Sequence, residues 1–380
     1  MRLVAESGLW TTGRSAAASP LVAVLEVSGA VLSWTIDEPA DTTQITFTDL
    51  SRADWLWRVV GEAGHVALAS AVAEAAGSGP DEPGAIELTG VDIVPGSVGP
   101  LHRLAVGHWL RRWWPASQRD GIAGLDRALL DVEIATLTVG AQGFFTDDTL
   151  DSDVAELLAP HAATLITHAR TGDPRVRDLV RAGAELADEF GVAGIGWPEL
   201  SMAVHDSSAA PPQPTGRQDD YALAAGADGS PIGSAAIARG VASINWAAVP
   251  PGIFDAAEDT VSWRVEAAGP AVVAVVRAAV IGPDPATGVP VQVRSGDVRG
   301  TGALESNGRA TLPMVDAAQR PVTESAAWNH DWPTTSVVIG ADLAESRLTR
   351  DRIRSWARAR LHRPPDDAFL TEILAAESAY

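Results

Sequence analysis

Residues 240–340 contain seven short runs of apolar or alternating residues, and turn residues separate each run from the next. The runs lie at Val241–Val249, Thr260–Glu266, Ala271–Ile281, Val289–Arg294, Thr301–Leu304, Ala310–Met314 and Ser336–Ile339. Asn307-Gly308 is the two-residue signal of a type I′ hairpin, in which both residues need a positive φ. Short strands at this spacing predict an antiparallel β-sandwich.

Two stretches resemble known folds. The residues from Val289 to Met314 resemble the transthyretin-like or immunoglobulin-like modules found beside many bacterial enzymes. The segment Thr171–Leu179 contains Gly-Asp-Pro-Arg-Val-Arg, which resembles the junction of HEAT-like helical repeats and occurs once. Asp173 before Pro174 is a good helix start, because the carboxylate accepts backbone N–H groups and proline lacks an N–H that the first turn would leave unpaired. Both resemblances concern the fold and imply no activity.

The whole chain predicts an α+β protein of several domains. Strands on both sides of Ser28-Gly29 and a third at Thr43–Thr48 alternate with helical segments and indicate a small α/β domain. Apolar residues at helical spacing indicate a helical middle region. The predicted order is a small α/β domain at 1–98, a helical domain at 99–200, a linker at 201–239, the sandwich at 240–341 and a helical tail at 342–380.

All 28 basic residues are arginines, so the chain contains no lysine, and it contains no cysteine. The missing lysine excludes a P-loop, Schiff-base and pyridoxal chemistry, and the protein-kinase ion pair. The missing cysteine excludes thiol nucleophiles, disulfides, iron–sulfur clusters and Cys-ligated zinc. A GC-rich coding sequence explains the missing lysine, and selection against lysine modification is the alternative. Hydrolysis through Ser, His and Asp stays open.

The formal net charge of −21 at pH 7 makes the chain strongly acidic. This charge disfavours binding to nucleic acid and to anionic membranes, both of which attract clustered positive charge. It is compatible with a protein partner that has a basic surface. No apolar stretch typical of a signal peptide follows Met1, and the run Ala271–Ile281 is too short to cross a bilayer. We therefore expect a cytoplasmic protein.

Tryptophan and arginine are concentrated in the predicted helix at 108–114. Trp109 and Trp113 share a helix face, whereas Arg112 and Trp114 point elsewhere. Because Trp and Arg are the usual hot-spot residues of interfaces, these four are candidate partner-binding residues. The alternative is that Trp109 and Trp113 fill a core between helices.

The loop Trp328-Asn329-His330-Asp331-Trp332 precedes the last predicted strand. Loops at the end of a sandwich often carry recognition residues, so Trp328, His330, Asp331 and Trp332 are candidate contacts to a partner. His330 beside Asp331 also has the composition of a general base, although no Gly-x-Ser-x-Gly sequence supplies a nucleophile. The alternative is that both tryptophans cover one end of the sandwich.

The tail helix is basic, with seven arginines against Glu345 and Asp351 in residues 343–363. Arg350, Arg354 and Trp356 of this helix are the remaining candidate partner-binding residues. The alternative is that the helix docks on the acidic body of its own chain, or presents a solvated face.

Neither a metal site nor a cofactor is predicted. The acidic run from Asp147 to Asp153 lacks the glycine and the distal glutamate of a calcium loop, and helix capping accounts for it. His161 and His168 lack a third ligand for zinc, and we expect both to be partly exposed surface residues.

The favoured hypothesis is a non-enzymatic scaffold or adaptor of a bacterial cytosolic complex, bound to another protein or to a second copy of itself. The absence of every strong catalytic sequence pattern favours it, as do the Trp- and Arg-rich candidates. Two alternatives stay open. One is an Asp/His-dependent hydrolase of unknown substrate, and the other is a small-ligand or carbohydrate-binding module that uses the 328–332 loop.

Overall fold

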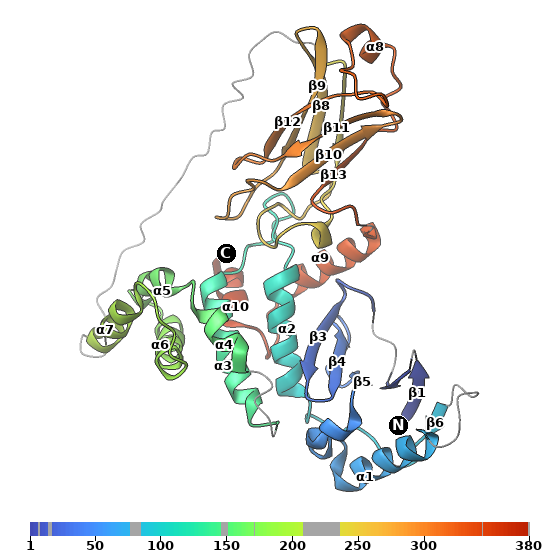
Figure 1. Cartoon of the computed structure of the whole chain (residues 1–380). Coiled ribbons are helices and arrows are strands. Elements are labelled where there is room, and N and C mark those ends of the chain that lie inside the picture. The colour runs from blue at the N-terminus through green and yellow to red at the C-terminus, as the bar shows by residue number, and fades with distance from the viewer. Residues whose placement is uncertain are drawn as a thin grey trace. The chain divides into compact units, whose positions relative to one another are not determined.

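The computed structural model describes residues 1–6, 8–13, 17–76, 85–145, 151–170, 172–207, 236–343 and 345–378. The chain forms two compact units: unit 1 comprises Met1–Arg112, Leu125–Pro214 and Ala359–Tyr380, and unit 2 comprises Trp113–Gly124 and Thr215–Arg358. Across the described residues there are ten α-helices and three antiparallel sheets (Figure 1), which confirms the mixed α+β class. The predicted domain boundaries stay predictions. Most of the predicted linker, residues 208–235, lies outside the described residues.

The sheet of unit 1 has its strands in the order β3-β4-β5-β2-β1-β6. These strands are β1 (Arg2–Glu6), β2 (Leu9–Thr12), β3 (Val22–Val27), β4 (Ala30–Thr35), β5 (Gln44–Phe47) and β6 (Ala85–Glu87). The predicted strands around Ser28-Gly29 are confirmed as the β3–β4 hairpin. Gly29 has φ of 71°, and a Cβ there would collide with the Asp49 carbonyl oxygen, so the turn requires glycine.

Alternate residues of these strands form the core of unit 1. Leu32 and Trp34 of β4 and Ile45 of β5 are fully buried. The indole Nε1 of Trp34 donates to Thr43 Oγ1 at 2.8 Å and to the Ala40 carbonyl at 3.1 Å. The buried polar atom of the ring is therefore paired, and the β4–β5 connection is fixed to the core.

Eight helices belong wholly or mainly to the described part of unit 1. They are α1 (Trp57–Ala76), α2 (Gly99–Trp113), α3 (Arg127–Gln142), α4 (Asp151–Leu158), α5 (Ala162–Ala169), α6 (Pro174–Glu189), α7 (Trp197–Ser207) and α10 (Leu370–Ser378). The helix start predicted at Asp173-Pro174 is confirmed, since the Asp173 carboxylate accepts from the Arg175 N–H at 2.8 Å. Gly183 of α6 allows a close approach to α3, because a Cβ there would lie 2.8 Å from Val132 Cγ1.

Unit 2 contains two antiparallel sheets, in the orders β12-β9-β8-β7 and β11-β10-β13. Their strands are β7 (Ala238–Ala242), β8 (Val261–Ala268), β9 (Ala271–Ala278), β10 (Pro290–Ser295), β11 (Val298–Ala303), β12 (Arg309–Pro313) and β13 (Ser336–Ile339). Inward-facing residues of both sheets, such as Val276 and Val293, belong to one hydrophobic core. The helices α8 (Glu324–Trp328) and α9 (Arg347–His362) follow β12 and β13, respectively.

A turn is present at Asn307-Gly308, where the Gly308 N–H donates to the Glu305 carbonyl at 3.0 Å, but the predicted type I′ hairpin is wrong. Only Gly308 has a positive φ, of 75°, so a type I′ turn is not formed. The flanking strands β11 and β12 pair with β10 and β9, respectively, and so belong to different sheets. The turn therefore carries the chain from one sheet to the other.

In the part of the chain that the structure describes, no helix combines the length and the apolar character needed to cross a lipid bilayer.

Candidate functional site

The segment between β12 and β13 is held in place by its own hydrogen bonds. Helix α8 begins at Thr323, whose Oγ1 accepts from the Ala326 N–H at 3.3 Å. The indole of Trp332 is buried, and its Nε1 donates to the Ala327 carbonyl at 2.8 Å. These bonds fix the end of α8 and the loop that follows it.

His330 ties the same segment to strand β10. Its Nε2 lies 3.0 Å from Ser295 Oγ and 3.1 Å from the Ser295 carbonyl oxygen. Its ring meets the Trp332 ring edge-on, with 4.6 Å between the ring centroids. The Ser295 hydroxyl is 3.2 Å from the Asp331 carbonyl, to which it can donate, and Ser295 is fully buried. This arrangement stabilises the loop and presents no serine nucleophile, so it adds no support for the His330–Asp331 general base.

Trp328 is the exposed aromatic residue of this segment. The residue is 55% exposed, and its Nε1 lies 3.4 Å from Glu324 Oε1. Asp331 is exposed nearby in sequence. Trp332, the other candidate tryptophan of this loop, is 7% exposed and belongs to the core, which fits the alternative for this residue. Trp328 is therefore the member of the pair that a partner can reach.

The tryptophans at 109–114 are less accessible than their composition suggests. Trp109 is buried in unit 1 and donates from Nε1 to the Pro20 carbonyl at 2.6 Å, which fits the core alternative. Arg112, Trp113 and Trp114 are half-buried, and Trp114 Nε1 donates to a carbonyl within unit 2 at 2.8 Å. A partner-binding role for the three half-buried residues stays a prediction.

Two arginines of α9 lie in a buried ion cluster of unit 2. Arg350 donates to both carboxylate oxygens of Glu258, at 2.8 and 2.9 Å. Arg354 donates to the same carboxylate at 2.9 Å and to the Ala256 carbonyl at 2.8 Å. These contacts fit the docking of the helix on its own chain, and they remove Arg350 and Arg354 from the accessible surface of unit 2. Trp356, on the same helix, is half-buried.

The pKa values of the two glutamates in this cluster, Glu258 and Glu345, shift in opposite directions. Burial raises the pKa of the Glu258 carboxyl, but hydrogen bonds from Arg350, Ser243 and Arg354 outweigh burial and lower the pKa to about 2. Burial also raises the pKa of Glu345, and there the Trp246 N–H and Arg350 only partly offset it. Glu258 is therefore the fixed negative centre of the cluster.

A second buried carboxylate, Asp131 of α3, holds three elements of unit 1 together. It accepts from Arg111 Nε at 2.8 Å and from Arg127 Nε at 3.1 Å, and it lies 2.8 Å from His161 Nε2. Burial raises its pKa, but the hydrogen bond from His161 and the two guanidinium charges outweigh burial and lower the pKa. Arg127 and Asp131 form an i,i+4 pair on α3 that the local sequence could have indicated, whereas Arg111 and His161 come from distant parts of the chain.

His161 and His168 are partly exposed, as expected, but neither is a free surface residue. Their side chains are 12% and 20% exposed, and each pairs with an aspartate. His168 Nε2 lies 2.7 Å from Asp126, the residue that caps α3. Both histidines thus hold α5 against α3.

His102 of α2 is buried, and its Nε2 has no hydrogen-bond partner. Burial lowers its pKa from the usual 6.5, the Asp367 charge opposes this effect and the Arg360 charge adds to it. The unfolded chain therefore binds a proton below pH 6.5 that the folded chain excludes, so unit 1 should lose stability as the pH falls from 7.5 to 5.5. In His102→Phe this loss should be smaller, as measured by hydrogen exchange of α2. Equal losses in the variant and the wild type would contradict the assignment, and exposed His362→Gln is the control.

Among the described residues, no group of three or more His, Asp or Glu side chains could hold a metal ion. Of the acidic run, Asp147 and Asp148 lie outside the described residues. The chain matches no protein-family model, no curated protein and no solved structure.

Proposed function

We propose that the protein is a non-enzymatic interaction protein and that unit 2 binds a protein partner through Trp328. The two sheets of unit 2 would form a β-sandwich of the transthyretin-like or immunoglobulin-like kind, which their common hydrophobic core supports. The complex would assemble in the bacterial cytoplasm, as inferred from the sequence. The exposed indole on a fixed segment is the observation that carries the proposal.

Trp328 has the properties of an interface anchor. Its exposed ring surface is on the order of 100 Å², so its burial would stabilise a complex by about 2–3 kcal/mol. Because hydrogen bonds of Thr323 and Trp332 already order the segment, little further conformational entropy is lost on binding. Preorganised aromatic residues of this kind dominate the energetics of interfaces.

The charge around Trp328 indicates the chemistry of the partner. Glu324, one helical turn earlier, and Asp331 are both exposed. A partner that combines an apolar socket with arginine or lysine at its rim would match this surface. A carbohydrate could stack on the same indole, and the experiment below distinguishes that outcome.

Trp328→Ala is expected to weaken partner binding about 30-fold or more, which is the loss typical of an interface hot spot. The fold should be unaffected, because the indole lies outside the core. The measurement is quantitative affinity purification of the full chain from cells of its source organism, followed by titration of the purified partner. Trp57→Ala removes a tryptophan of unit 1 that is 45% exposed and serves as the matched control.

Two results would count against this proposal. Recovery of the same partner by wild type and by Trp328→Ala in equal amounts would remove Trp328 from the interface. Saturable binding of a glycan that Trp328→Ala abolishes, with no protein partner recovered, would favour the carbohydrate-binding alternative.

A further inference from the structure

The outer face of the four-stranded sheet of unit 2 carries every charged residue of its four described strands. Apolar side chains at alternate positions of these strands face the core, so the positions between them face outward. The outward charged residues are Arg239 of β7, Arg264 and Glu266 of β8, Arg277 of β9 and Arg309 of β12. We call the surface formed by these four arginines the arginine face.

Strand pairing brings the four arginines together. Arg309 of β12 lies opposite Arg277 of β9, and Arg239 of β7 lies opposite Arg264 of β8. The register between β8 and β9 places these two pairs in neighbouring rows of the face. Since adjacent strands lie about 4.8 Å apart and alternate residues of a strand about 7 Å apart, the four Cα atoms fall within roughly 16 Å of one another.

The positive charge of the arginine face is only partly compensated. Arg264 Nε donates to a carboxylate oxygen of Glu266 at 2.8 Å. Within the ranges that the structure describes, the side chains of Arg239 and Arg309 have neither an ion pair nor a hydrogen bond. The face therefore has guanidinium groups to offer to a partner, in a chain whose formal net charge is −21.

The arginine face is accessible. Arg277 is exposed, and the side chain of Arg264 is 38% exposed. Val241 of β7 faces the same side and is 60% exposed, which adds an apolar contact at the edge. The exposed acids Asp259 and Glu305 precede β8 and β12, respectively, and lie outside the strands.

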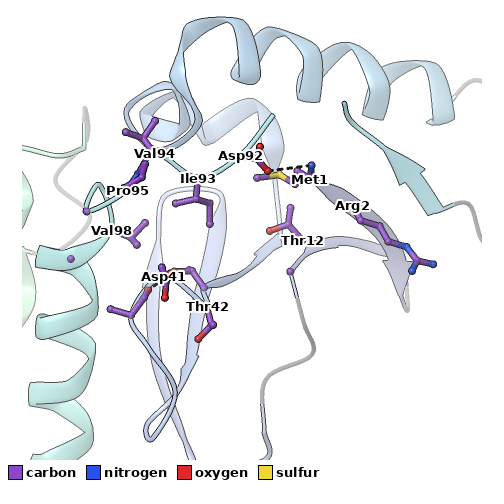
Figure 2. Close-up of a pocket in the computed structure, with 15 residues that line it drawn as sticks. Met1, Arg2, Thr12, Asp41, Thr42, Asp92, Ile93, Val94, Pro95 and Val98 are labelled. Atoms are coloured by element: carbon purple, nitrogen blue, oxygen red, sulfur yellow. Dashed lines mark hydrogen bonds and ion pairs between the residues drawn. The ribbon is translucent and has the colours of Figure 1, made fainter. Parts of the chain in front are cut away.

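The hollow of about 770 Å³ in unit 1, by contrast, is balanced in charge (Figure 2). Its lining includes the Met1 nitrogen and Arg2 against Asp41 and Asp92. The Met1 nitrogen lies 3.8 Å from Asp92, and Arg2 lies 3.6 Å from Glu87. The hollow thus selects no charged ligand, whereas the arginine face selects an anionic one.

We propose that the arginine face docks an extended acidic segment of a partner protein. Guanidinium groups bind carboxylates through two parallel N–H···O bonds. In an extended segment, side chains on one side recur about every 7 Å, which matches the spacing of the two rows of arginines. This surface differs from the one at Trp328, where exposed acids favour a basic partner, and the inference does not rest on that proposal.

The size of the arginine face favours a short acidic segment over nucleic acid. Nucleic acid carries negative charge along its whole length. Because the chain as a whole is strongly acidic, it repels a polyanion that extends beyond the four arginines. A short acidic segment of a protein avoids this repulsion, since its charge meets the face alone.

Fluorescence polarisation with the full chain tests the face. The probe is a fluorescein-labelled peptide of about ten residues in which Glu and Thr alternate, long enough to span the face, and the matched peptide has Gln at each Glu position. At about 20 mM salt the Glu peptide should bind saturably, and the Gln peptide should bind about 10-fold more weakly or worse. Raising the salt to about 200 mM should weaken binding of the Glu peptide, because surface ion pairs are screened.

Two double variants locate the binding. Arg239→Gln combined with Arg309→Gln should weaken binding of the Glu peptide about 10-fold, or about threefold for each ion pair, and leave the thermal midpoint unchanged. Arg294→Gln combined with Arg299→Gln removes the same charge from exposed positions of the three-stranded sheet and should leave binding unchanged. Trp328→Ala should also bind the Glu peptide as the wild type does, so this test and that of the Trp328 interface can fail independently.

Four outcomes would overturn the inference. The first three are no saturable binding of the Glu peptide up to about 5 mM, equal binding of the Glu and Gln peptides, and equal losses in the two double variants. The fourth is tighter binding of an oligothymidylate than of the Glu peptide, lost in the Arg239→Gln, Arg309→Gln variant, which would assign the face to nucleic acid.

Discussion

Glu258→Gln is expected to lower the free energy of unfolding of unit 2 by about 3–5 kcal/mol, the range found when one partner of a buried ion pair is removed. The amide keeps the size of the side chain and removes its charge. Arg350 and Arg354, with side chains 9% and 3% exposed, would then share no carboxylate at this position. The effect comes from two buried guanidinium groups that lose their shared carboxylate and keep only their remaining partners, which are Glu345 for Arg350 and Asp351 and Asp120 for Arg354.

Amide hydrogen exchange measures this effect unit by unit. Peptides from β8 and β9 should exchange faster in Glu258→Gln, whereas peptides from the sheet of unit 1 should not change. Glu305→Gln, an exposed glutamate of unit 2, should stay within about 0.5 kcal/mol of the wild type. If Glu258→Gln lowers the free energy of unfolding of unit 2 by less than about 1 kcal/mol, the ion cluster contributes little to stability and the prediction is wrong.

Glu258→Gln should also change how the stability of unit 2 depends on pH in the acid range. The pKa of Glu258 is lowered to about 2 in the folded state, against 4.5 ordinarily. A lowered folded-state pKa contributes stability that is complete above pH 4.5 and is lost as the pH falls toward 2. Glu258→Gln lacks this titration, so the stability of unit 2 should fall less steeply across that window than in the wild type. Equal slopes would contradict the assignment.

Asp131→Asn is expected to lower the free energy of unfolding of unit 1 by about 2–4 kcal/mol, since the buried carboxylate is the common acceptor of three cationic or polar groups. Arg111 and Arg127 are partly exposed and can regain water, which keeps the expected loss below that of a fully buried pair. Hydrogen exchange of peptides from α3 and α5 measures it. The control is Asp178→Asn, which removes a 69% exposed partner of Arg181 on α6 and should have an effect below about 1 kcal/mol. Equal effects of the two variants would show that Asp131 is not the energetic centre of the cluster.

The strands that sequence patterns predicted are those with local signals. In unit 2, alternation and bounding turns located β8, β9, β10 and β13 to within a few residues of their observed ends. β1 and β2 of unit 1 were missed, and long-range pairing with β6 and β5 holds them in the sheet. Such pairing leaves little trace in a window of neighbouring residues.

The turn at Asn307-Gly308 shows a different limit. Its residues permit a hairpin, and the local sequence contains no competing signal. Which sheet each flanking strand joins is decided by the core, where Val298 of β11 and Leu312 of β12 are both buried. The residues of the turn therefore do not indicate which sheet each flanking strand joins.

The sequence predicted the position of the candidate site but not the contacts that form it. Composition identified the loop with Trp328 and Trp332, and Thr323 before Glu324 is a local capping signal for α8. Which of the two tryptophans is buried depends on the contacts of Trp332 with His330 and the Ala327 carbonyl. Ser295 and the ion partners of Glu258 are distant in the chain, so no spacing pattern indicates them.

Site-specific photocrosslinking in cells of the source organism shows directly whether Trp328 contacts a protein partner. A photoreactive phenylalanine analogue at position 328 lies on the proposed anchor, and the same analogue at position 57 lies on an exposed site of unit 1. The proposed function predicts a discrete protein adduct from position 328 that position 57 does not give. Glu324→Gln and Asp331→Asn, which remove the negative charges beside position 328, should reduce the yield of this adduct. No protein adduct at position 328, or the same adducts from both positions, would contradict the assignment of Trp328 as a partner-binding residue.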